Sequence, residues 1–186
     1  ISTLGMMGRT QPLHIYAHAD LEKLLRPLLD YHCQDLPYEV EFHAINPRKK
    51  EVIFEDRTLT IETIPLKHKV PTCGFLFTEH HRDKEPRKRY AYCSDTAYRE
   101  QIVEQIAGVE VLFHEATYTE KDADKCKKHT HSTAKQAAQI AKLAGARKLV
   151  IGHFSAREDD HQVFLNEARE VFKNTVLAVE KETIEL

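Results

Sequence analysis

The sequence pattern changes about half-way along these 186 residues, from mostly strand-like runs to an alternation of helices and strands. This change constrains the fold more than any other feature. Up to residue 93 the chain is rich in short apolar or alternating runs of the kind that form strands, apart from a helical leucine pattern near residue 20. Strands are predicted at residues 12–16, 38–45, 51–54, 59–64, 74–77, 90–93, 109–113, 148–151 and 176–179, and helices from about residue 20 and at 99–106, 133–144 and 161–172. Strands followed by helix-strand alternation predict a layered α/β fold in which helices cover a sheet.

The composition favours one compact domain over residues 1–186, because 41% hydrophobic residues with 6 glycines and 7 prolines can bury a substantial core. No apolar run approaches the roughly 18 residues that span a membrane, and the first residues lack the layout of a secretory signal. No membrane contact and a cytoplasmic location are therefore expected. The four cysteines form no C-x-x-C pair, which favours reduced thiols over a disulfide framework.

The formal net charge is −2, so a nucleic-acid partner would have to be held by local patches. Two basic stretches are present, at residues 80–89 and 121–131. The candidate RNA contacts in them are Arg87, Lys88, Arg89, Lys125, Lys127 and Lys128. Charge alone does not separate these stretches from ordinary solvated loops of mixed charge.

Acidic or imidazole side chains follow four of the predicted strands, where α/β folds tend to build their sites. They are His68, Asp95, His114 with Glu115, and His153. Each one alone is weak evidence, since a histidine after a strand is commonly structural and an aspartate there can cap a turn. Together they suit zinc, because imidazoles and carboxylates bind this ion and a carboxylate can bridge two ions about 3.5–4 Å apart.

Five short motifs follow one another along the chain. They are PLKHKVPTCGF at 65–75, YCSDT at 92–96, HEAT at 114–117, HST at 131–133 and GHFSAR at 152–157. In order and approximate spacing they resemble the later motifs of the ribonuclease Z family within the metallo-β-lactamase superfamily. Residues 1–9 look like the segment that follows the main metal motif of that family. The combination of HEAT, HST and H-x-S-A-R resembles the tRNA-processing branch in particular.

The resemblance implies an α/β protein with the metallo-β-lactamase fold, an αβ/βα four-layer sandwich whose N-terminal portion lies outside this chain. It also implies a homodimeric, zinc-dependent endoribonuclease that removes the 3′ trailer of precursor tRNA through metal-activated water, with two Zn²⁺ ions in the active site. Carried over residue by residue, His68 would bind one zinc ion, His153 the other, and Asp95 would bridge them. His131 and Glu115 would form the catalytic pair.

The residues around His131 support this role independently. His131 precedes a predicted helix that Ser132 or Thr133 can cap, and Gln136 can complete a capping box from Thr133. The N–H groups of a helix start favour an anionic phosphate. Glu115 can accept a hydrogen bond from the imidazole and hold it as a proton donor to the leaving oxygen. A helix-start histidine without chemistry is the alternative. His114 suits a structural role as well as a functional one, and His14, His18, His32, His43 and His161 are expected at the surface.

Two departures from the family leave other functions open. The family's His-x-His-x-Asp-His motif is absent and is expected just upstream of Ile1, and a chain beginning at Ile1 would bind zinc poorly and cleave nothing. Bacterial relatives extend a long tRNA-binding arm where this chain has only residues 78–89, so either this protein lacks the arm or the 186 residues leave part of it out. The alternatives are another hydrolase of the superfamily, which has less reason to carry His131 and Glu115, and an incomplete RNA-binding module.

Overall fold

The computed structural model describes residues 1–80 and 88–185. The chain divides into two compact units, Ile1–Asn46 and Pro47–Leu186, and each is described by itself. The single domain expected over residues 1–186 stays a prediction, and the short arm expected at 78–89 lies largely outside the described residues. None of the described helices combines the length and the apolar character that crossing a membrane requires.

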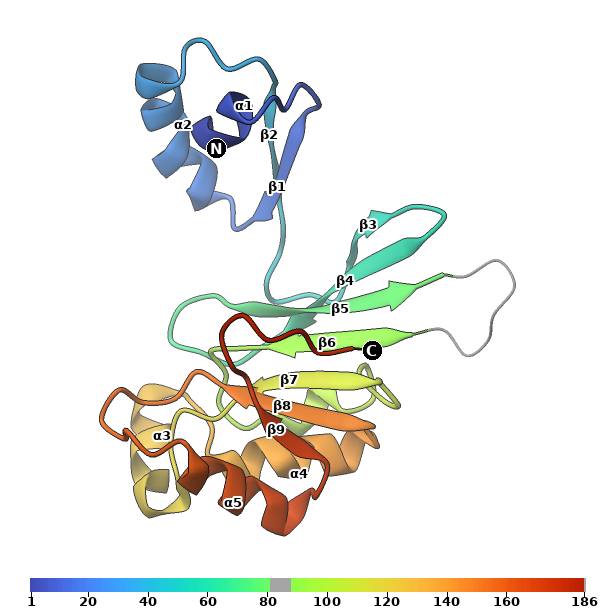
Figure 1. Cartoon of the computed structure of the whole chain (residues 1–186), viewed down its shortest axis with the longest axis vertical. Helices are drawn as coiled ribbons and strands as arrows, with labels where there is room; N and C mark the ends of the chain where they lie inside the picture. Colours follow the sequence, from blue (N-terminus) through green and yellow to red (C-terminus); the bar gives the residue numbers. More distant parts are fainter. Residues whose placement is uncertain (81–87, 186) are drawn as a thin grey trace. The chain divides into compact units, whose positions relative to one another are not determined.

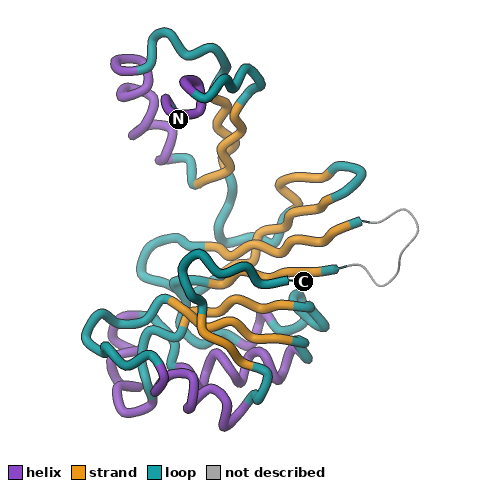
Figure 2. Tube along the Cα trace, viewed as in Figure 1, coloured by secondary structure: helices purple, strands orange, loops and turns teal. Residues whose placement is uncertain are grey.

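The first unit contains two helices and a two-stranded parallel sheet (Figure 2). Its elements are α1 (Ser2–Met6), β1 (Leu13–Ala17), α2 (Asp20–His32) and β2 (Val40–Ala44). Arg26 of α2 lies over the ring of Phe42, 4.9 Å from its centroid, and donates to the carbonyl of Val40, so α2 covers the Phe42 face of the sheet. The strands and the leucine helix of this unit are confirmed, whereas α1 is too short to give a periodic signal.

The second unit is built on a seven-stranded sheet in the order β3-β4-β5-β6-β7-β8-β9. The strands are β3 (Val52–Glu55), β4 (Leu59–Pro65), β5 (Cys73–Glu79), β6 (Arg89–Cys93), β7 (Val111–Glu115), β8 (Lys148–Gly152) and β9 (Thr175–Leu177). Neighbours from β3 to β6 are antiparallel, and neighbours from β6 to β9 are parallel. The strands predicted for this unit are therefore confirmed.

The directions of the strands bring several strand ends to one edge of the sheet. β4 and β6 run the same way, because each is antiparallel to β5 between them. β7 and β8 are parallel to β6, so the carboxyl ends of β4, β6, β7 and β8 share one edge (Figure 1). Side chains that follow these strands are consequently neighbours in space although they are far apart in the sequence.

Helices α4 (Ala134–Ala144) and α5 (Gln162–Val171) cover one face of this sheet (Figure 1). The buried side of α4 consists of alanines and one isoleucine, and small side chains allow a helix to lie close to the strands. The fully buried side chains between helices and sheet include Leu112 of β7, Ile151 of β8 and Phe164 of α5. The packing of these elements fixes the sheet edge on which the strand-end residues lie.

Both helices of the second unit that the sequence predicts beyond residue 130 are confirmed. At the start of α4, Thr133 accepts from the N–H of Gln136, and the side chain of Gln136 accepts from the N–H of Thr133. This is the predicted capping box, which satisfies two backbone donors that a helix start otherwise leaves free. The segment that carries His131 is therefore held at a fixed helix start.

Two other segments of this unit differ from the prediction. Residues 99–106 form a 3₁₀ helix, η1 (Glu100–Ile102), followed by turns. These already bury Ile102 and Ile106, so no α-helix is needed to place them in the core. Residues 121–131, predicted as a basic loop, include the end of η2 (Glu120–Asp122) and α3 (Ala123–His129). Only Cys126 of α3 is buried, so the sequence lacks the apolar stripe that would signal a helix.

Candidate functional site

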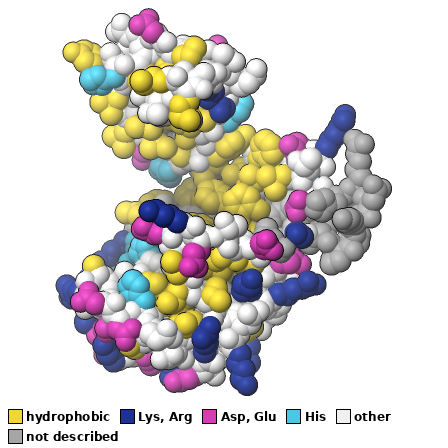
Figure 3. Space-filling view, in the orientation of Figure 1, with side chains coloured by type: hydrophobic (Ala, Val, Ile, Leu, Met, Phe, Trp, Pro, Cys, Tyr) yellow, Lys and Arg dark blue, Asp and Glu magenta, His cyan; other side chains and the backbone are white. Residues whose placement is uncertain are grey.

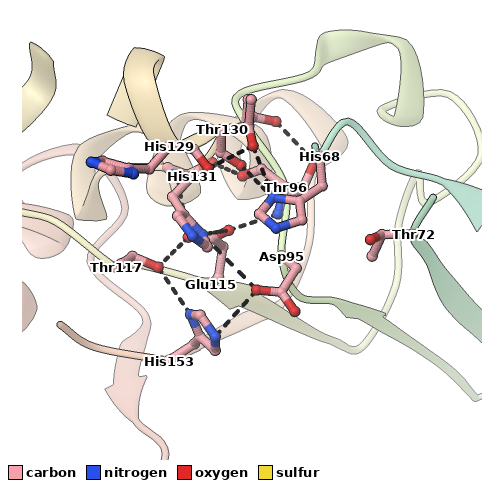
Figure 4. Close-up of polar contacts among 12 residues, drawn as sticks. His68, Thr72, Asp95, Thr96, Glu115, Thr117, His129, Thr130, His131 and His153 are labelled. Carbon is pink, nitrogen blue, oxygen red and sulfur yellow. Dashed lines mark hydrogen bonds and ion pairs between the residues drawn. The ribbon is translucent and has the colours of Figure 1, made fainter. Parts of the chain in front are cut away.

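All five predicted metal and catalytic residues meet at the shared edge of the sheet (Figure 4). His68 follows β4, Asp95 follows β6, Glu115 is the last residue of β7, and His153 follows β8. His131 lies in the short link between α3 and α4. Ligand atoms from His68, Asp95 and His131 lie within 4.8 Å of one another, as do those from Glu115, His131 and His153. The strand ends thus bring the singled-out side chains together.

Glu115 is fully buried and accepts hydrogen bonds from four donors. Its Oε1 accepts from the N–H of Thr96 at 2.6 Å and faces Nδ1 of His131 at 2.8 Å. Its Oε2 accepts from the hydroxyl of Thr117 at 2.5 Å and from the N–H of Ser132 at 3.1 Å. A buried carboxylate is stable only when it is saturated in this way. Because an ionised carboxylate only accepts, Nδ1 of His131 carries the proton of the shared hydrogen bond.

The hydroxyl of Thr117 determines which ring nitrogen of His153 carries the proton. It donates its one proton to Glu115 and lies 3.0 Å from Nδ1 of His153, so it accepts from that nitrogen. Nε2 of His153 is then the nitrogen with a free lone pair, and it lies 3.2 Å from Oδ1 of Asp95. This hydrogen-bonded arrangement is the one that orients metal-binding histidines in proteins.

His68 is oriented in the same manner by Thr130. Nδ1 of His68 lies 3.0 Å from both the carbonyl oxygen and the hydroxyl of Thr130. The carbonyl can only accept, and the hydroxyl already donates to the carbonyl of His129, so Nδ1 of His68 is the donor. Nε2 of His68 is therefore left free to bind a ligand.

Three residues of the site have a positive φ angle, a backbone conformation that residues other than glycine rarely adopt. The φ angles are 56° at Asp95, 61° at Thr130 and 59° at His153. Positive φ costs free energy for residues other than glycine and persists where the surrounding structure enforces it. Two predicted metal ligands and the residue that orients the third thus lie in strained positions, which is typical of functional sites.

The residues present fit a divalent metal. The two free imidazole nitrogens and the carboxylate of Asp95 are the donor types that zinc prefers. The side chains of Asp95 and His153 are 43% and 42% exposed, which leaves solvent and substrate access to the ligand atoms. Glu115, by contrast, has all its acceptor positions occupied by protein donors, so it orients neighbouring groups and is unsuited to bind an ion.

Four residues that support the site were not singled out from the sequence. They are Thr96, Thr117, Thr130 and Ser132. Thr117 and Ser132 lie inside the HEAT and HST motifs, so the motifs themselves are the signal that could have identified them. Thr130 gives no such signal, because its role depends on the carbonyl and hydroxyl that reach His68 across 62 residues.

The other histidines divide into buried and surface groups. His114 is 1% exposed, its Nε2 has no partner among the described residues, and burial lowers its pKa from the ordinary value of 6.5. It points into the core and has the structural role. His14, His18, His32 and His161 are exposed as expected, while His43 is half-buried.

The candidate RNA contacts have different surroundings. Arg87 lies outside the described residues, and the guanidinium of Arg89 donates to the carbonyls of Ala107 and Gln105. Lys125 pairs with an aspartate of η2, with 2.7 Å between Nζ and the carboxylate. Lys88, Lys127 and Lys128 are exposed. In the view of Figure 3, basic and acidic side chains alternate over the second unit instead of forming one basic face.

A cavity of about 250 Å³ adjoins the site. Thr117, which orients His153, lies in its lining, together with Lys121, Lys125 and Arg157. Asp122 and Glu158 line the same hollow, where they pair with Lys125 and Lys121. The hollow therefore carries charges of both signs.

The comparison with known proteins agrees with this arrangement. Residues 1–154 match the family described as Beta-lactamase superfamily domain. The chain is 42% identical to the ribonuclease Z of Phocaeicola vulgatus over 229 aligned positions, which cover all of this chain and 74% of that protein. It is 43% identical to the ribonuclease Z of Bacteroides fragilis, with 75% of that protein covered. Both alignments are longer than the chain, so these relatives carry residues with no counterpart here.

The fold also matches a solved structure. The crystal structure of human tRNase Z, short form, superposes with a TM-score of 0.77 at 23% sequence identity, covering 99% of this chain and 71% of that one. This likeness shows the metallo-β-lactamase fold with its central sheet, while the sequence identity to the bacterial proteins shows the closer relationship. The chain is accordingly a member of the ribonuclease Z family of endoribonucleases, within the metallo-β-lactamase superfamily.

Proposed function

We propose that this protein is a zinc-dependent endoribonuclease that removes the 3′ trailer of precursor tRNA. The observation that carries the proposal is the hydrogen bond between His131 and the buried Glu115, next to the ligand atoms of Asp95 and His153. Phosphodiester hydrolysis needs a positioned proton donor beside a site that neutralises phosphate charge. The names of the bacterial relatives and of the human structure support a tRNA substrate.

His68, Asp95 and His153 are the residues of this chain that would hold the metal. When bound, zinc supplies Lewis acidity that polarises the phosphodiester and activates water. The Nε2 atoms of the two histidines are free to bind the ion, since their Nδ1 atoms are engaged by Thr130 and Thr117. Oδ1 of Asp95 lies 3.2 Å from Nε2 of His153 and 4.0 Å from Nδ1 of His131, so its carboxylate is next to both the ligand atoms and the proposed acid.

His131 is proposed to donate the proton that the departing ribose oxygen requires. Glu115 fixes the ring by accepting from Nδ1, which leaves Nε2 as the atom that meets the substrate. The hydrogen bond to Glu115 holds the imidazole in a fixed orientation, as its function as an acid requires. Glu115 does not touch the substrate in this scheme and acts as a positioning residue.

The RNA is proposed to contact the exposed lysines of α3. Lys127 and Lys128 are exposed, whereas Lys125 and Lys121 are paired with Asp122 and Glu158. Phosphate contacts from such residues supply affinity without sequence specificity. A homodimer and a cytoplasmic location are further parts of the proposal that rest on the family resemblance.

The test is cleavage of a precursor tRNA labelled at its 3′ end by the intact protein loaded with zinc. We expect a single cut that releases the trailer as one fragment, and loss of this cut in His131→Ala with unchanged zinc content. His32→Ala, an exposed histidine of the first unit, is the matched control. Hydrolysis of a small phosphodiester or thioester without cleavage of the tRNA would instead support another hydrolase of the superfamily, and RNA binding without any hydrolysis would support a binding module.

A further inference from the structure

A second group of metal-ligating side chains lies in the first unit, which contributes none of the residues of the site described above. The parallel register of β1 and β2 places His14 opposite Glu41 and Tyr16 opposite His43. Because side chains alternate between the two faces of a strand, these four residues share one face. α2 covers the opposite face through Arg26, so the group stays open to solvent.

The donor atoms of three of these residues form a small triangle. Nδ1 of His14 lies 3.0 Å from Nε2 of His43 and 3.2 Å from Oε2 of Glu41, and Nε2 of His43 lies 3.8 Å from the same oxygen. Ligand bonds of about 2.0–2.1 Å in tetrahedral geometry place neighbouring donors roughly 3.3 Å apart. The triangle therefore has the size of one face of a tetrahedral zinc shell.

The surroundings of the triangle leave its donor atoms in place and accessible to an ion. The ring of His43 stacks on Tyr16 at 4.5 Å between centroids, which limits its rotation. The side chains of His14, Glu41 and His43 are 47%, 41% and 38% exposed, so water can complete the fourth position. Two imidazoles, one carboxylate and one water form a recurrent zinc shell. An ion bound by His14 of β1 and by Glu41 and His43 of β2 would join the two strands.

We propose that His14, Glu41 and His43 form a zinc-binding site, with water as the fourth ligand, that clips β1 to β2. The site is independent of the catalytic one, since it shares no residue with it. Zinc bound here strengthens the first unit and takes no part in hydrolysis.

The test counts zinc by elemental analysis after dialysis against zinc alone, in the intact protein carrying His68→Ala and His153→Ala, which removes both histidine ligands named for the catalytic site. We expect addition of His14→Ala and His43→Ala to remove one zinc ion per chain. The matched control adds His18→Ala and His32→Ala, which alter two exposed histidines of the same unit outside the triangle. Equal zinc in the two proteins would overturn the proposal.

Hydrogen exchange tests the clip separately, in the same background. Zinc should slow amide exchange in residues 13–17 and 40–44 of the protein with an intact triangle and leave exchange unchanged in Glu41→Gln, which keeps the shape of the side chain and loses its charge. Circular dichroism of Glu41→Gln verifies that the unit remains folded. Loss of one zinc ion in His14→Ala with His43→Ala, but no zinc-dependent protection of these strands, would contradict the clip.

Discussion

The hydroxyl of Thr117 joins the two halves of the catalytic site at the scale of a single residue. It donates its proton to the buried Glu115 and accepts a hydrogen bond from Nδ1 of His153. This one hydroxyl therefore holds the carboxylate of Glu115 and also leaves Nε2 of His153 free. Groups that orient metal ligands in this way are worth roughly 10–100-fold in metal affinity or activity. The catalytic pair and the metal ligands are therefore coupled through a residue that touches neither substrate nor ion.

Thr117→Val is predicted to weaken zinc binding and cleavage by roughly 10–100-fold, because valine keeps the shape and removes both hydrogen bonds. Zinc affinity by competition with a chelating dye and single-turnover cleavage of precursor tRNA measure the effect. Thr119→Val is the matched control: Oγ1 of Thr119 is buried with no partner among the described residues, so the same substitution removes no hydrogen bond. Equal behaviour of the two variants would show that Thr117 only fills space.

His114 is predicted to make the fold sensitive to acid. Burial lowers the pKa of this histidine below 6.5, so the unfolded chain takes up a proton that the folded chain refuses as the pH falls below 6.5. Stability is complete above that pH and falls by up to about 1.4 kcal/mol per pH unit below it, until the folded pKa is reached. His114→Leu should flatten the dependence of unfolding free energy on pH by one proton in urea titrations between pH 7 and pH 5. An unchanged slope would argue against a neutral buried imidazole.

At the scale of elements, the start of α4 holds His131 in place. Its capping box joins Thr133 to Gln136, and the backbone next to it pairs with the segment after β7, where the N–H of Tyr118 donates to the carbonyl of Ser132. A helix start fixed in this manner cannot shift without moving the imidazole. The cap therefore belongs to the catalytic geometry as well as to the helix.

Thr133→Ala is predicted to lower the free energy of unfolding by about 1 kcal/mol, the usual cost of removing an N-cap. The hydroxyl also donates to Glu120 at 3.2 Å, and the same variant removes this hydrogen bond. Chemical denaturation of the intact protein measures the change, and Lys142→Ala, at an exposed position of the same helix, serves as the control. We expect the Lys142 variant to differ from the parent by less than roughly 0.5 kcal/mol.

On the scale of the whole molecule, a net charge of −2 means that RNA must be attracted by part of the surface. The exposed lysines of α3 lie in the helix that follows β7 and precedes His131, at the carboxyl edge of the sheet where the site is. The opposite edge, where β8 and β9 begin, carries other basic residues such as Lys173. Position relative to the sheet therefore distinguishes candidate RNA contacts from ordinary surface charge.

Lys127→Gln with Lys128→Gln is predicted to weaken tRNA binding and to make it less dependent on salt. Removing a lysine that neutralises one phosphate should reduce the slope of log affinity against log salt by roughly 0.7–0.9. Filter binding across a salt series measures the slope, and Lys173→Gln provides a substitution of the same kind at the far edge of the sheet. If Lys173→Gln reduced the slope as much as the double variant, the result would contradict a localised RNA surface.

The sequence by itself determined which residues are candidates for the site and on which elements they lie. The strands are recognised from short apolar runs, and the residue that ends each run is visible in the sequence; these residues are His68, Asp95, Glu115 and His153. The capping box after His131 is recognised in the same way. These features depend on a few neighbouring residues, and the confirmed strands and α4 show that such local signals were sufficient. Local patterns failed at η1, where an α-helix was predicted and a 3₁₀ helix with turns is found. They also failed at α3, whose charged sequence lacks the apolar stripe that signals a helix.

Only the tertiary structure decided how those residues work together. The direction of β4 relative to β6 depends on β5 between them, and no local pattern states that their ends meet. The proton positions on His68 and His153 depend on Thr130 and Thr117, and the triangle of the first unit depends on the register of β1 against β2. Pairing register and hydrogen bonds between distant segments are long-range properties, because they arise from packing that involves the whole sheet.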